Sequence, residues 1–81
     1  DFPMLPLAYK SLSQGAGPIA YNAANEVAVA AFLKEKILFT QIATVTEKVL
    51  QHDWSQEPVT IEEVFLFDKK ARQLAQDIVE N

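Results

Sequence analysis

The stretch PIAYNAANEVAVAAFLK, residues 18–34, decides the fold of this 81-residue chain. Wound as a helix, it is apolar around almost its whole circumference, and a helix of that kind normally lies at the centre of its domain. Pro18 suits a first helical turn, while Lys34 and Lys36 suit the negative C-terminal end of the helix dipole. The sequence therefore predicts a central helix from Pro18 to about Lys34.

Two further stretches with apolar residues at helical spacing lie on either side of this helix. One covers residues 3–14. Because Pro6 lacks an N–H, we expect regular helix there to begin near Leu5. The other covers residues 41–51, with Thr40 as its expected N-cap.

The last helical stretch, residues 61–79, opens with the pattern of a capping box, in which Thr60 is the N-cap and Glu63 the third helical residue. Later in it, Asp68 and Arg72 form an i,i+4 pair in the favourable order. The side chains expected in the core are Ile42, Val45, Val49, Leu50, Ile61, Val64, Phe65, Ala71, Leu74, Ala75 and Ile78, together with Phe32, Phe39 and Phe67. Apolar runs that could pair as strands are too short and isolated, so the predicted fold is all-α and resembles a four-helix bundle.

Composition limits the classes of protein. A length of 81 residues allows one domain, residues 1–81, and the absence of cysteine excludes disulfides and thiolate metal sites. A net charge of −4 with scattered basic residues does not favour nucleic acid as a partner. The longest nearly uncharged run is too short to span a membrane, and no signal peptide is visible. The chain begins at Asp1 rather than methionine, which indicates a piece of a longer protein.

The polar residues Asn22, Asn25 and Glu26 stand at i, i+3 and i+4 and therefore share one side of the central helix. One carboxylate is too few for a two-carboxylate mechanism or a hard-metal site. Val29 and Leu33 continue the same side, so we expect it to be covered. Covered polar groups must be hydrogen-bonded, and the pattern predicts a structural polar network that joins this helix to neighbouring helices or to another domain.

Other candidate sites have simpler interpretations. The run GAGPIA, residues 15–20, matches a dinucleotide-binding pattern, but that pattern needs a preceding strand, so we interpret it as a helix break. His52 lacks partners for catalysis or metal binding. Trp54 is interpreted as a packing or docking residue, and Asp68 to Arg72 as a solvated face. From periodicity and spacing the chain is a helical scaffold, with no catalytic, cofactor-binding or metal-binding residue assigned.

Four segments resemble the C-terminal domain of the 1-deoxy-D-xylulose 5-phosphate reductoisomerase family. Residues 2–8 (FPMLPLA) are similar to its F-P-x-L-x-L-A, with Pro6 as a departure, and residues 22–33 (NAANEVAVAAFL) are similar to its most recognisable C-terminal segment. Ile37-x-Phe39-x-x-Ile42 follows at the family's distance, and Asp68-x-x-Ala71-Arg72-x-x-Ala75 is similar to its last helix.

The resemblance implies a parent enzyme of non-mevalonate isoprenoid biosynthesis. It converts 1-deoxy-D-xylulose 5-phosphate to 2-C-methyl-D-erythritol 4-phosphate with NADPH and Mg²⁺ or Mn²⁺. The parent is expected to be a homodimer in the bacterial cytoplasm or a plastid. The resemblance places its NADPH and catalytic domains outside this region, so the chain alone is expected to be inactive and to pack against the remaining domains of the same subunit. The alternative is a free-standing helical module that binds a partner protein.

Overall fold

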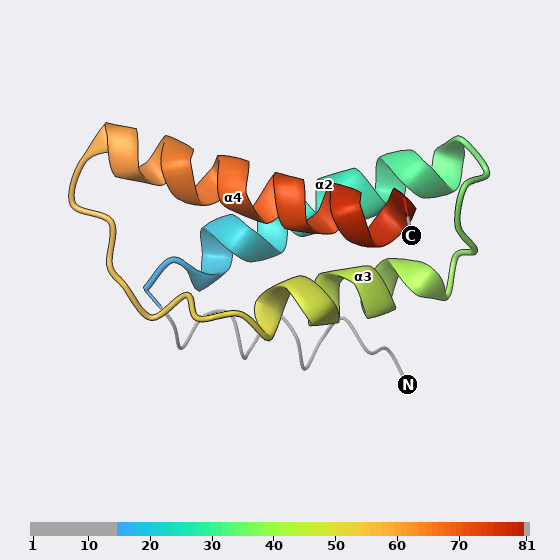
Figure 1. The fold of residues 1–81 in the computed structure, drawn as a ribbon, viewed down its shortest axis with the longest axis horizontal. Helices are drawn as coiled ribbons and strands as arrows, with labels where there is room; N and C mark the ends of the chain where they lie inside the picture. The colour runs from blue at the N-terminus through green and yellow to red at the C-terminus, as the bar shows by residue number, and fades with distance from the viewer. Residues whose placement is uncertain (1–14, 81) are drawn as a thin grey trace.

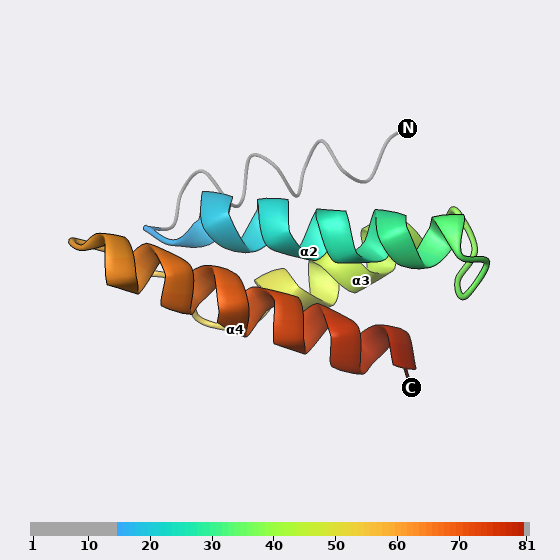
Figure 2. The ribbon, with the colours of Figure 1, turned by 90° about the horizontal axis from the view of Figure 1, so that it is seen from above.

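The computed structural model describes residues 15–80 of the chain. They form three helices: α2 (Gly17–Leu33), α3 (Gln41–Leu50) and α4 (Ile61–Glu80). Figures 1 and 2 show that α2 and α4 run in the same direction and α3 runs in the opposite one. Residues 15–80 contain no strand, so the predicted all-α class is confirmed. The helix expected over residues 3–14 lies outside the described residues, and a four-helix arrangement stays a prediction.

The central position of α2 is confirmed, because α2 packs against both α3 and α4. Its buried residues are all small: Gly17, Ala20, Ala23, Ala24, Ala28 and Ala31. Side chains that end at Cβ let the neighbouring helices approach closely. The core is completed by larger side chains from α3 and from the loop that follows it, which include Ile42, Val45, Val49, Leu50 and Trp54.

The end of α2 is closed by a Schellman motif. The N–H of Lys36 donates to the carbonyl of Ala31, and the N–H of Glu35 donates to the carbonyl of Phe32, both over 2.9 Å. This motif requires a left-handed residue, and Glu35 supplies it with a φ of 61°. Glycine is the usual residue at such a position, because a Cβ atom is strained there.

The core side of α3 agrees with its predicted pattern, since Ile42, Val45, Val49 and Leu50 are all buried. The cap expected from Thr40 is wrong. Thr40 occupies the N-cap position in helical geometry, and its side chain makes no capping hydrogen bond. The Gln41 side chain instead accepts a hydrogen bond of 2.7 Å from the backbone N–H of Leu38.

Trp54 holds the connection between α3 and α4 in place. Its ring is fully buried, and its backbone carbonyl accepts a hydrogen bond of 2.8 Å from Ala16 just before α2. Gly15 lies so close to this loop that an added Cβ would stand 2.8 Å from the backbone oxygen of Gln56. The interpretation of Trp54 as a packing residue is confirmed.

The core side of α4 was predicted correctly only for its second half. Ala71 and Ala75 are buried, and Leu74 and Ile78 pack against the core. The prediction was wrong for the beginning of the helix, where Ile61, Val64 and Phe65 are exposed by 69%, 37% and 66%. These residues lie beyond the part of α4 that rests on the core, so periodicity identified an apolar side that residues 15–80 do not cover.

Candidate functional site

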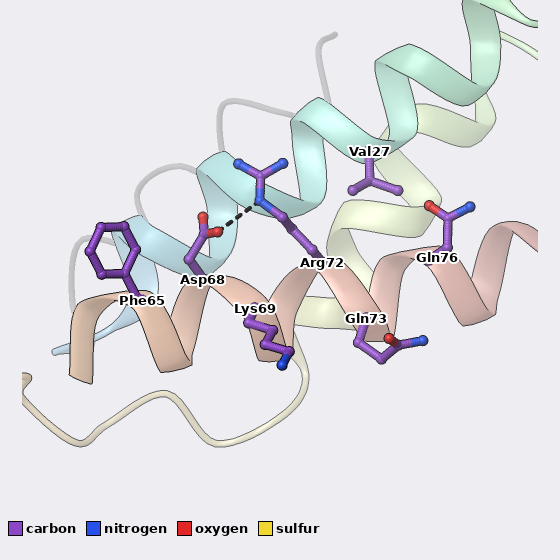
Figure 3. A pocket seen from close by; sticks show the side chains of 7 residues that line it. All are labelled: Val27, Phe65, Asp68, Lys69, Arg72, Gln73 and Gln76. Atoms are coloured by element: carbon purple, nitrogen blue, oxygen red, sulfur yellow. Dashed lines mark hydrogen bonds and ion pairs between the residues drawn. The ribbon is translucent and has the colours of Figure 1, made fainter. Parts of the chain in front are cut away.

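A shallow, open groove lies between α2 and α4 (Figure 3). It encloses about 580 Å³ and is lined by Val27, Phe65, Asp68, Lys69, Arg72, Gln73 and Gln76. Val27 belongs to α2 and the other six residues to α4. In Figure 3 the Arg72 side chain extends from α4 toward α2.

Arg72 joins the two helices through two carboxylates. Its Nε donates to Asp68 over 2.8 Å along α4, and its Nη2 donates to Glu26 on α2, also over 2.8 Å. The i,i+4 pair predicted between Asp68 and Arg72 is confirmed. The hydrogen bonds that Arg72 donates to Asp68 and then to Glu26 raise the pKa of its guanidinium above the ordinary value, so Arg72 keeps its charge.

This ion-pair cluster is open to water. The side chains of Arg72 and Glu26 are 40% and 55% exposed, and exposed pairs contribute about 0.2–1 kcal/mol each. Two carboxylates already occupy the guanidinium, so the cluster is a contact between helices rather than a free anion-binding group. It can fix the relative position of α2 and α4.

Residues 15–80 do not bury the polar cluster on α2, and its role as a network that reaches another domain stays a prediction. Asn22 and Glu26 are exposed, and Asn25 is half-buried. Within residues 15–80, Glu26 pairs with Arg72, and no recorded hydrogen bond links it to Asn22 or Asn25. Within these residues Leu33, which was taken to continue a covered side, is itself 72% exposed.

The capping box before α4 is present, with one difference in its return bond. The Glu63 N–H donates to Thr60 Oγ1 over 3.1 Å, as expected. The Glu63 carboxylate accepts the N–H of Val59 over 2.7 Å, one residue before the N-cap. This pair fixes the start of a helix whose first apolar side chains are exposed.

The remaining candidate residues do not assemble a reactive site. His52 lies exposed just after α3. Gly15 and Ala16 form a turn and α2 begins at Gly17, as the helix-break interpretation expects. Residues 15–80 hold no group of three His, Cys, Asp or Glu side chains that could bind a metal ion. None of the helices in this part of the chain has the length and apolar character that crossing a bilayer requires.

Sequence reasoning missed two features. The bond between Glu26 and Arg72 joins residues 46 positions apart, which no pattern within one helix can reveal. The exposed apolar start of α4 did leave a signal. Phe65, Leu66 and Phe67 are consecutive, so they point to different sides of a helix, and one core-facing stripe cannot cover all of them.

Comparison with known proteins gives consistent matches. The family described as the DXP reductoisomerase C-terminal domain matches residues 1–74. A 1-deoxy-D-xylulose 5-phosphate reductoisomerase of Treponema denticola is 49% identical over 93% of this chain and 20% of its own length. The Zymomonas mobilis protein of that name is 48% identical over 99% of this chain and 21% of its own.

A solved structure agrees. The Zymomonas mobilis reductoisomerase in complex with NADPH superimposes with a TM-score of 0.93, at 48% identity, over 99% of this chain and 21% of that one. The chain thus spans about a fifth of the length of these relatives. The matches give no support to the alternative of a free-standing interaction module. With the family matched over residues 1–74, the chain belongs to the DXP reductoisomerase C-terminal domain family.

Proposed function

We propose that residues 1–81 form one helical domain of a reductoisomerase subunit that converts 1-deoxy-D-xylulose 5-phosphate to 2-C-methyl-D-erythritol 4-phosphate with NADPH. One observation carries this proposal: nearly the whole chain matches reductoisomerases at 48–49% identity while spanning 20–21% of their length. The subunit acts in non-mevalonate isoprenoid biosynthesis. It is a homodimer of the bacterial cytoplasm or a plastid, without a nucleic acid or membrane partner.

Within this subunit the chain has a structural role. The residues of α2, α3 and α4 do not fit a divalent cation, since no three ligating side chains come together among residues 15–80. We assign the binding of NADPH and of Mg²⁺ or Mn²⁺, and the reduction itself, to the other domains. The contribution of this chain is a helical body that packs against them and supports the shape of their site.

The polar side of α2 forms part of this packing surface. Asn22 is exposed and Asn25 is half-buried, and amide side chains at such positions can hydrogen-bond to another domain without loss of contacts inside this one. The Asn25→Leu variant distinguishes three roles for this amide: contact with another domain, an internal network, or participation in the reaction. If the amide faces the other domains, the change is nearly neutral in the isolated chain, within about 0.5 kcal/mol, and lowers the unfolding midpoint of the full-length subunit.

An internal network, by contrast, requires that Asn25→Leu costs about 1–3 kcal/mol in the isolated chain as well. If Asn25 takes part in the reaction directly, Asn25→Leu should leave the stability of the isolated chain and of the full-length subunit normal. The full-length variant should then lose turnover at saturating substrate. Asn22→Leu is the matched variant one turn earlier on the same side of α2.

The catalytic part of the proposal is tested on a full-length subunit that carries this chain. It should oxidise NADPH only when 1-deoxy-D-xylulose 5-phosphate and Mg²⁺ or Mn²⁺ are both present. The isolated chain should not oxidise NADPH, and titration calorimetry should detect no micromolar binding of NADPH or Mn²⁺. Stoichiometric tight binding of either ligand to the isolated chain would overturn the structural role.

A further inference from the structure

The first two turns of α4 are apolar on several sides. Successive residues of a helix are separated by about 100° around its axis, so Phe65, Leu66 and Phe67 point to three different sides. Phe65 and Leu66 are 66% and 64% exposed. Exposed apolar side chains gathered on neighbouring sides of a helix mark a surface that contacts other protein, although Glu62 and Glu63 in the first turn keep the segment from being apolar all round.

Only one of these sides is covered by the described part of the chain. Phe67 packs edge-on against the buried Trp54, with ring centroids 6.4 Å apart. Phe65 lies at the end of the groove that α4 forms with α2 (Figure 3). Leu66 lines a separate shallow groove with Lys69, Lys70, Gln73 and Leu74. The core formed by residues 15–80 therefore accounts for Phe67 and leaves Phe65 and Leu66 uncovered.

The exposed arc is wide. From Ile61 through Phe65 to Leu66 it extends about 140° around the helix axis. Phe65 and Leu66 point about 100° apart around the axis, so a surface that covers both must curve around the helix. The arc requires a recess with two apolar walls, one against Phe65 and the other against Leu66.

The same arc also carries a charged side chain near its middle. Glu62 falls between Phe65 and Leu66 around the helix axis and is exposed. A carboxylate enclosed between apolar walls is costly unless a cation pairs with it. The recess must therefore carry a basic side chain opposite Glu62.

We propose that the first two turns of α4 insert into such a recess, with apolar walls and a basic group opposite Glu62, formed by the rest of the reductoisomerase subunit. The inference rests on the proposed function. The reductoisomerases matched here carry about four-fifths of their length beyond the region that this chain covers. That additional polypeptide supplies enough surface for a recess of two walls.

The test uses thiol labelling of a full-length subunit, because this chain contains no cysteine of its own. Leu66→Cys introduces a thiol on one flank of the arc and Phe65→Cys on the other. Gln73→Cys is the matched control. It lies about two turns further along α4 on the same side as Leu66 and is exposed. The rate of maleimide labelling is read peptide by peptide by mass spectrometry.

We expect the thiols at positions 65 and 66 to react at least about tenfold more slowly than the thiol at position 73, since enclosed positions react only through local opening. Equal rates at all three positions would overturn the insertion. Protection at only one of positions 65 and 66 would overturn the two-walled recess, and protection lost on dilution would assign the surface to a second copy. NADPH oxidation by the unsubstituted subunit is measured separately, so a failure of the proposed function is distinguished from a failure of the insertion.

Discussion

The indole N–H of Trp54 donates a hydrogen bond of 2.8 Å to the backbone carbonyl of Val49, five residues earlier. This bond holds a fully buried ring against the C-terminal end of α3. On the outer side, the Lys70 ammonium lies 5.1 Å from the ring centroid. The loop from α3 to α4 is thus organised around Trp54, whose side chain contacts α3 and α4 and whose backbone carbonyl binds the turn before α2.

Replacement of Trp54 by phenylalanine should destabilise the chain by about 1–3 kcal/mol, because it removes the hydrogen bond to Val49 and leaves part of the ring's volume empty. Trp54→Ala should cost more, about 3–5 kcal/mol. Lys70→Met is the control, since it removes the cation and keeps the ring, and it should cost less than about 1 kcal/mol. Denaturant midpoints followed by circular dichroism give these values. A Trp54→Phe midpoint equal to that of the parent chain would contradict this role.

Thr60→Ala should cost roughly 0.5–2 kcal/mol, because the N–H of Glu63 loses its capping partner. Glu63→Gln is the matched control, since an amide oxygen can still accept the N–H of Val59, and its effect should be smaller. Urea denaturation of the three proteins compares them directly. An unchanged midpoint for Thr60→Ala would count against the cap.

The ion pair between Glu26 and Arg72 should contribute little and depend on salt. Both side chains are largely open to water, so the coupling energy of a double-mutant cycle with Glu26→Gln and Arg72→Gln should lie below about 1 kcal/mol. This coupling energy should shrink as the salt concentration is raised from about 0.05 M to about 1 M, because salt screens the attraction between exposed charges. A coupling of several kcal/mol, insensitive to salt, would show that the pair is buried in solution.

Glu35→Gly should stabilise the chain by about 0.5–1 kcal/mol. Glycine relieves the left-handed strain at this position, which is about 1–2 kcal/mol, and part of that gain is offset by the greater freedom of glycine in the unfolded state. The preceding residue is the control. Lys34 has a φ of −92°, so Lys34→Gly relieves nothing and should destabilise. Thermal unfolding should move the two variants in opposite directions, and a shift of both in the same direction would refute the argument.

Asp53 should titrate at lower pH than an ordinary aspartate. The Ser55 hydroxyl at 2.6 Å and the Ser55 N–H at 2.9 Å both donate to its carboxylate and lower its pKa. The stabilising contribution is present above the pKa of the unfolded state and is lost as pH falls through the folded-state pKa. Ser55→Ala should raise the Asp53 pKa, as followed by carboxyl ¹³C shifts. No change in that pKa would show that the hydroxyl does not bind the carboxylate.

Sequence patterns correctly predicted features that depend on contacts within one helix, or on a helix having one side that faces the core. The bounds of α2 and α3 were found because their apolar residues repeat at helical spacing, and the Asp68–Arg72 pair because it is local. The patterns failed for Phe39 and Phe65, which are 71% and 66% exposed. An apolar side chain at core spacing indicates that it will be covered, and it does not indicate which polypeptide will cover it.

The same limit explains the polar cluster on α2. The spacing of Asn22, Asn25 and Glu26 showed correctly that they share one side of a helix. It carried no information on α4, whose Arg72 takes Glu26 as a partner from 46 residues away. Family resemblance supplied what periodicity could not, because the segment from 22 to 33 identifies the kind of protein.

The alanine-lined side of α2 has a consequence for conformational entropy. Alanine has no rotamers to lose on folding, whereas a buried leucine or isoleucine loses about 0.5–1 kcal/mol of rotamer freedom. Ala20, Ala23, Ala24, Ala28 and Ala31 therefore form a core surface without freezing any side chain, at the expense of a small apolar area per residue. Such a surface also has no rotamers of its own with which to repack when a neighbouring helix shifts.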